Sequence, residues 1–118
     1  MVRDYKELIV WQKAMDLVDE IYRLVRYLPK DEKYALSDQM RRSCVSIPSN
    51  IAEGFDRKSQ KEYLHFLSIA NGSKAEIETQ LMICVRQNFL TDAQTEKVIS
   101  LCKEIGKMLS SIMKRFSD

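Results

Sequence analysis

Hydrophobic residues recur at the three-and-four spacing of amphipathic helices in four stretches of the chain. The first stretch covers residues 8–28 and is ended by Pro29. The second restarts at Asp31 and Glu32, acidic residues that favour a first helical turn, and runs toward Gly54. The apolar positions are Trp11, Ala14, Leu17, Val18, Ile21, Leu24, Val25 and Leu28 in the first stretch and Leu36, Met40, Cys44, Ile47, Ile51 and Phe55 in the second.

The third and fourth stretches each begin at a capping box, in which a hydroxyl side chain and a residue three positions later bond the free N–H groups of a helix start. Ser59 and Glu62 form the first box, and Thr91 and Gln94 form the second. Residues 88–90 connect the two helices, and the fourth helix is expected to run nearly to the C-terminus.

Pro48 lies inside the second stretch, where it cannot donate a backbone hydrogen bond and its ring crowds the carbonyl group of Cys44. The apolar pattern continues through this residue in phase, so we expect a helix that is kinked near Pro48 and not ended there. Ser46, Ser49 and Asn50 flank the proline, and their short side chains can bond the backbone groups that it frees.

Connections of only a few residues join the four helices, and such short loops favour antiparallel neighbours. The sequence therefore predicts an all-α fold, an antiparallel up-down-up-down four-helix bundle that takes in residues 1–118 as a single domain. Three glycines and two prolines agree with this, because an all-β sandwich or barrel needs more tight turns than they can supply.

Length and composition argue against a membrane or secreted protein. The longest apolar run, residues 81–85, is far shorter than the roughly 20 residues of a membrane-spanning helix. Residues 1–6 contain no apolar core of a secretory signal. We therefore expect a soluble, cytoplasmic protein.

The cysteines and the single histidine, His65, are too few and too scattered for most catalytic or metal sites. Cys44, Cys84 and Cys102 are odd in number and far apart, so neither a disulfide framework nor a zinc motif is available. We expect reduced thiols in the core, no metal or other cofactor, and no enzymatic activity.

The formal net charge of +2 is too small to indicate a nucleic-acid-binding protein by composition alone. The predicted topology, however, gathers the chain start, the turn at residues 54–58 and the chain end at one end of the bundle. Eight basic residues meet five acidic ones there. We call the centre of this surplus the basic pole, which consists of Lys58, Lys61, Lys107, Lys114 and Arg115.

Lys103, Lys107 and Lys114 also share one face of the fourth helix and form a ridge. Two interpretations stay open for this ridge. It is either an ordinary solvated helix face or a surface that contacts phosphate.

Several runs of residues resemble the four-helix-bundle proteins encoded by intervening sequences in bacterial 23S ribosomal RNA genes. The most specific run is residues 46–54, which read SIPSNIAEG. The likeness extends along nearly the whole chain and fades in the last helix. The other matching positions are Tyr5, Leu8, residues 10–14, Gln39, Arg41, Arg42, Arg57, Ser59, Glu62, Tyr63, Phe66, Leu67, Ile69, Ala70, Gly72, Ser73, Glu76 and Thr79.

That family is similar in turn to the accessory variability proteins of diversity-generating retroelements, which are pentameric bundles that bind nucleic acid and a reverse transcriptase. The resemblance implies a bacterial homo-pentamer with a central channel. It supplies no catalytic residues and no established activity.

The polar positions that match the family allow two hypotheses. Arg42, Glu53 and Glu76 form a buried or half-buried ion network that sets the helix register. Alternatively, hydrogen-bond donors of the second helix face phosphate or a partner protein, namely Arg41, Arg42, Ser49 and Asn50.

Large side chains on the apolar stripes also have two interpretations. Trp11 and Tyr63 pack in the core or an interface, or they stack on bases. Met15, Tyr22 and Tyr27 widen the stripe of the first helix, which indicates either coverage by another subunit or ordinary tyrosines with exposed hydroxyl groups.

Two function classes follow from these patterns. The first is an oligomer that binds nucleic acid, preferably structured RNA, through basic ridges repeated on its subunits. The second is an oligomeric adaptor that docks another protein, for example a reverse transcriptase. The residues expected to contact nucleic acid are Lys58, Lys61, Lys103, Lys107, Lys114 and Arg115.

Overall fold

A computed structural model describes residues 1–116 of the chain, and these residues form helices and turns without a strand. The four long helices are α1 (Ile9–Leu24), α2 (Leu36–Phe55), α3 (Gln60–Arg86) and α4 (Asp92–Phe116). Short 3-10 turns, η1 (Tyr5–Glu7), η2 (Val25–Tyr27) and η3 (Lys30–Glu32), precede α1 and link it to α2. The all-α four-helix fold expected from the sequence is confirmed.

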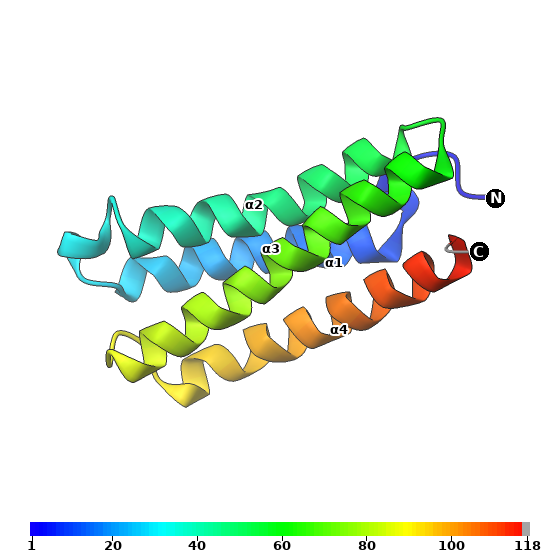
Figure 1. Cartoon of the computed structure of the whole chain (residues 1–118). Helices are drawn as coiled ribbons and strands as arrows, with labels where there is room; N and C mark the ends of the chain where they lie inside the picture. Colours follow the sequence, from blue (N-terminus) through cyan, green and yellow to red (C-terminus); the bar gives the residue numbers. More distant parts are fainter. Residues whose placement is uncertain (117–118) are drawn as a thin grey trace.

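The helices lie side by side in an elongated bundle that measures 43 × 24 × 22 Å. The colours in Figure 1 run in opposite directions along successive helices, so the chain reverses at each connection. α1 packs against α2 and α4, and α3 packs against the same two helices. α1 and α3 therefore occupy opposite corners of the bundle.

The core consists of the apolar stripes of all four helices. Its largest fully buried side chains are Leu17, Ile21, Leu24, Met40, Ile47, Ile51, Leu67, Ile77, Leu81, Val98, Ile105 and Leu109. The three cysteines are also buried and unpaired, which confirms their prediction as core thiols. Burial raises the pKa of Cys44 and Cys102 to about 12 and that of Cys84 to about 11. These thiols therefore stay protonated, and unreactive, near neutral pH.

The start of α2 differs from the expectation. Asp31 and Glu32 lie in the 3-10 turn η3, and the α-helix begins only at Leu36, because Ala35 has a non-helical backbone (φ −120°, ψ −104°). The Glu32 carboxylate accepts a hydrogen bond from the Leu36 N–H at 3.3 Å. Glu32 thus serves the start of the helix from outside it, as a cap and not as a member of its first turn.

Side-chain caps confirm the starts of α3 and α4. Ser59 Oγ accepts from the Glu62 N–H at 3.0 Å. Thr91 Oγ1 accepts from the Gln94 N–H at 3.1 Å, and Gln94 Oε1 accepts from the Thr91 N–H at 2.9 Å. The second capping box is therefore reciprocal.

α2 continues through Pro48, as the unbroken apolar pattern predicts. Asn50 Nδ2 donates to the Ser46 carbonyl oxygen at 2.7 Å and to Ser46 Oγ at 2.9 Å, so polar side chains do bond the backbone and each other beside the proline. The kink near Pro48 stays a prediction.

Candidate nucleic-acid interface

A basic groove of about 540 Å³ runs between α3 and α4. The predicted lysine ridge of α4, Lys103, Lys107 and Lys114, forms one wall, and Lys74 comes from α3. Glu78 is the only acidic residue among those that line it. The remaining lining residues are Asn71, Gly106, Ser110 and Ser111. The structure thus turns the ridge into one side of a concave, positively charged surface, which we call the α3/α4 groove.

Lys74 is recessed in this groove. Its ammonium nitrogen lies 3.1 Å from Glu78 Oε1, and the two side chains are only 16% and 20% exposed. A Cβ built on Gly106 would lie 3.1 Å from Lys74 Nζ and 3.2 Å from Lys74 Cε. Gly106 therefore leaves the space in which the end of the Lys74 side chain lies against α4.

The other residues of the basic pole lie outside the groove. Lys58 and Lys61 are exposed at the α2–α3 turn and the start of α3. Burial raises the pKa of the Tyr63 hydroxyl, and the positive charge of Arg115 partly offsets this rise, so Arg115 lies near the start of α3. The pole borders the end of the groove that Lys114 lines, but Lys58, Lys61 and Arg115 do not line the groove itself.

Arg57, next to the basic pole, adds less positive charge to this end of the bundle than the sequence indicates. Its guanidinium lies 2.6 Å from Glu53 Oε2 and 3.6 Å from Glu62 Oε1. It also lies 4.9 Å from the centre of the Phe66 ring. Two carboxylates therefore share the charge of this arginine.

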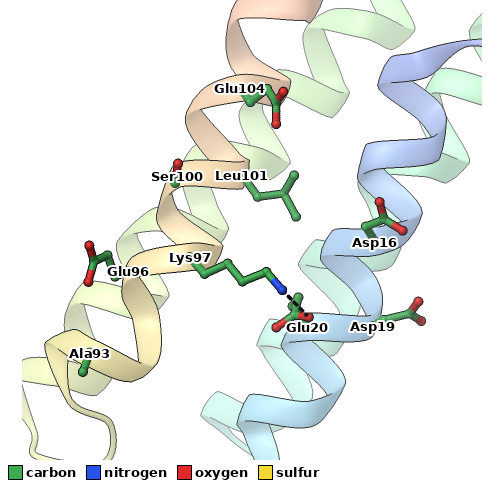
Figure 2. A pocket seen from close by; sticks show the side chains of 9 residues that line it. All are labelled: Asp16, Asp19, Glu20, Ala93, Glu96, Lys97, Ser100, Leu101 and Glu104. Carbon is green, nitrogen blue, oxygen red and sulfur yellow. Dashed lines mark ion pairs between the residues drawn. The ribbon is translucent and has the colours of Figure 1, made fainter.

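The opposite flank of α4 is acidic. A groove of about 720 Å³ between α1 and α4 is lined by Asp16, Asp19, Glu20, Glu96 and Glu104, with Lys97 as the basic residue among them, and Ala93, Ser100 and Leu101 complete it. Figure 2 shows Lys97 extending from α4 toward Glu20, and their charged atoms are 3.8 Å apart. A hydrogen bond from Arg23 lowers the pKa of Glu20, so this carboxylate is ionised. α4 thus separates a positive groove from a negative one.

The predicted ion network of Arg42, Glu53 and Glu76 is wrong. Arg42 pairs with Asp38 at 3.0 Å, and Glu53 pairs with Arg57. In the described part of the chain no ion pair joins the three residues, and all of them are exposed. The physical reason is local, because each paired residue finds an opposite charge one turn away on its own helix or at its end.

Neutral hydrogen bonds join α2 and α3 instead. Ser73 Oγ donates to Ser46 Oγ at 2.8 Å, and Gln80 Nε2 donates to Ser43 Oγ at 3.2 Å. Near the end of α2, a Cβ built on Gly54 would lie only 2.8 Å from Phe66 Cβ. Residues 46–54 therefore carry a hydrogen-bonded contact and a close approach of two helices. Ser49, also in this stretch, is exposed, so its predicted role as a donor to an external partner is still open.

Comparison with known proteins agrees with this helical architecture. The family model described as 23S rRNA-intervening sequence protein matches residues 6–111, which is most of the chain. The chain belongs to this family. A solved structure from Bacteroides thetaiotaomicron, a protein of unknown function from the S23 ribosomal protein family, is 31% identical and superposes with a TM-score of 0.83. The match covers 90% of this chain and 99% of that one. No curated protein matches this chain.

In this member of the family the aromatic candidates pack against other rings. Trp11 is half-buried and meets Tyr5 edge to face, with ring centres 5.5 Å apart. Tyr63 is half-buried between Phe55 and Phe116, whose ring centres lie 6.1 Å and 5.5 Å from its own. These contacts favour the packing interpretation over stacking on bases.

The widened apolar stripe predicted for the first helix lies on the surface of this family member. Met15 and Tyr22 of α1 and Tyr27 of η2 are 41%, 42% and 58% exposed. Within residues 1–116, no helix is both long and apolar enough to cross a membrane, and no cluster of three metal-ligating side chains occurs.

Sequence reasoning found the α4 ridge but missed Lys74 and the acidic groove. Lys74 and the acidic groove both lie where two helices meet. The periodicity of one helix does not show which of its sides will face a neighbouring helix. A weak signal exists for Lys74, since Lys74 and Glu78 are four residues apart and a glycine, Gly106, lies between Lys103 and Lys107 in α4.

Proposed function

We propose that this protein is an oligomeric nucleic-acid-binding protein that contacts RNA phosphates through the α3/α4 groove and the adjoining basic pole. The observation that carries the proposal is the separation of charge across α4. Four lysines and one glutamate line one flank, whereas five carboxylates and one lysine line the other. A polyanion is attracted to the first flank and repelled from the second.

Binding by a single copy is expected to be weak. Three or four lysine contacts predict that the binding constant falls by about one to two orders of magnitude between 50 and 200 mM salt. Lysine ammonium groups on flexible stems contact phosphate without reading base edges, so the binding should depend little on base sequence.

Oligomerisation offsets this weakness. Met15 and Tyr22 on α1 and Tyr27 on η2 expose apolar surface, which supports a contact with other copies of the chain. A closed homo-oligomer presents the groove several times to one long RNA, and linked contacts can raise apparent affinity about a hundredfold or more. The stoichiometry expected from the resemblance is a pentamer, which light scattering coupled to size exclusion measures directly.

A gel-shift experiment with a structured RNA at low salt tests the proposal. The double variant Lys103→Gln/Lys107→Gln should lose most of the retention. The matched control Lys13→Gln/Lys97→Gln removes two lysines that pair with Glu104 and Glu20 on the acidic flank, and it should retain RNA at least as well as the unmodified protein. Equal loss in both variants, or no binding by the unmodified protein at low salt, would contradict the proposal.

The acidic groove supports a second candidate function, an adaptor that docks a protein. Its carboxylates from α1 and α4 suit a segment rich in lysine or arginine, and the apolar face of α1 offers further contact surface. The same two double variants distinguish the candidates. An adaptor of this kind binds a basic partner with no contribution from Lys103 or Lys107, and RNA binding is then absent at low salt.

A further inference from the structure

We infer that the α3/α4 groove takes one single strand of nucleic acid, so that in a folded RNA the protein contacts a loop, bulge or end and not a helical stem. This inference rests on the proposed function and specifies the conformation of its ligand.

The recessed position of Lys74 is the first argument. Its side chain is 16% exposed and lies against α4 at Gly106, whereas Lys103, Lys107 and Lys114 are exposed. The Lys74 ammonium group therefore lies deeper between α3 and α4 than the lysine ridge does. A single backbone is slender enough to reach this group, whereas a duplex is broader and rests on the exposed lysines.

The chemistry of Lys74 leaves it able to bind a ligand. An ammonium group has three N–H donors, and the Glu78 carboxylate accepts from one of them at 3.1 Å. A phosphate oxygen or a ribose hydroxyl that reaches the groove floor can accept from another. Lys74 therefore distinguishes a ligand that enters the groove from one that stays at its rim.

The length and the walls of the groove also suit an extended strand. Lys103 and Lys114 are eleven residues apart on α4, which corresponds to about 16 Å along the helix axis. Asn71, Ser110 and Ser111 add short polar side chains that can bond sugar and phosphate oxygens. The acidic groove on the other flank of α4 keeps a polyanion from crossing that helix, so the strand follows the α3/α4 groove toward the basic pole.

Charge density alone favours a duplex ligand over a single strand. A duplex carries about one phosphate charge per 1.7 Å and normally gains more from a patch of lysines than a single strand does. Preference for the single strand therefore has to come from the recessed position of Lys74.

Fluorescence anisotropy at about 50 mM salt provides the test, with a labelled oligouridine of about 12 nucleotides and an RNA duplex of the same length. The full-length protein should bind the single strand at least about threefold more tightly than the duplex. Lys74→Gln should lower single-strand affinity about three- to tenfold and reduce that ratio toward one. Gly106→Ala, which keeps every charge but occupies the space beside the Lys74 ammonium group, should reduce the ratio in the same direction.

Lys97→Gln on the acidic flank is the matched control and should leave the ratio unchanged. Circular dichroism of each variant establishes that the helices are intact. Equal or tighter binding of the duplex by the unmodified protein would overturn the inference while leaving the proposed function in place. Absence of binding to either RNA would instead overturn the proposed function itself.

Discussion

Gly54→Ala should destabilise this bundle, although alanine is normally the better residue inside a helix. Gly54 is buried in the last turn of α2, where that helix meets the start of α3. A Cβ at this position would lie 2.8 Å from Phe66 Cβ, 3.1 Å from Tyr63 Cδ1 and 3.4 Å from the Tyr63 carbonyl oxygen. The nearest atom is a Cβ attached directly to the backbone, so relief requires α2 and α3 to move apart.

Two effects of opposite sign set the magnitude. Replacing a helical glycine by alanine contributes about 1 kcal/mol of stability through backbone entropy. Forcing an extra carbon into a filled contact costs about 1–3 kcal/mol, and the two distances near 3 Å place this site toward the upper part of that range. The net expectation is a loss of about 1–2 kcal/mol in the free energy of unfolding.

Gly72→Ala is the matched control, because Gly72 is an exposed residue within α3 and a Cβ there meets nothing within 4 Å. This variant keeps the entropic gain without the clash and should gain up to about 1 kcal/mol. Urea unfolding monitored by circular dichroism measures both changes, with the slope of the transition compared between variants. Two variants that shift in the same direction would refute the reasoning about close approach at Gly54.

Two further predictions concern the polar contact and the thiols. Ser73→Ala removes the hydroxyl that donates to Ser46 Oγ at 2.8 Å and should lower the free energy of unfolding by about 0.5–1.5 kcal/mol. Ser68→Ala, on the exposed side of the same helix, should lower it by almost nothing. Equal effects in urea unfolding would contradict a specific role of the α2–α3 hydrogen bond. The pKa values of Cys44, Cys84 and Cys102 in the folded protein lie above the ordinary thiol value. Their contribution to stability is therefore complete below about pH 9 and is lost as the pH rises toward 11–12. Cys102→Ala should make the fall in the free energy of unfolding above pH 9 shallower, and an unchanged slope would argue against burial of a neutral thiol.

The success of sequence reasoning about the helices depended on whether a local signal marked each end. Ser59 and Thr91 cap α3 and α4 as expected, because the hydroxyl and its backbone partner are only three residues apart. The sequence places the start of α2 too early, because acidic residues favour a helix start both from within the first turn and from just before it. Glu32 lies before the first turn, and the pattern of residues alone does not distinguish the two cases.

The candidate interface can be predicted from the sequence only where one helix supplies its residues. Lys103, Lys107 and Lys114 share a face of α4, and their spacing is sufficient to find them. The position of Lys74 in the groove depends on how α3 is rotated about its axis relative to α4. That rotation follows from side-chain packing and from the space at Gly106. The prediction of an ion network was wrong for a related reason. Residue types show which charges can pair, but they do not show which of several possible partners each charge will choose. Arg42 and Glu53 each pair with a residue four positions away.

The arrangement of helices makes the two parts of the proposed function compatible. α1 and α3 occupy opposite corners of the bundle, with α2 and α4 between them. The exposed apolar side chains Met15 and Tyr22 belong to α1, whereas the basic groove lies between α3 and α4. The proposed contacts between copies through α1 would therefore leave the groove open. Affinity for a strand that fills one groove should then be set by the lysines of a single copy, whereas apparent affinity for a long RNA should rise with the number of copies.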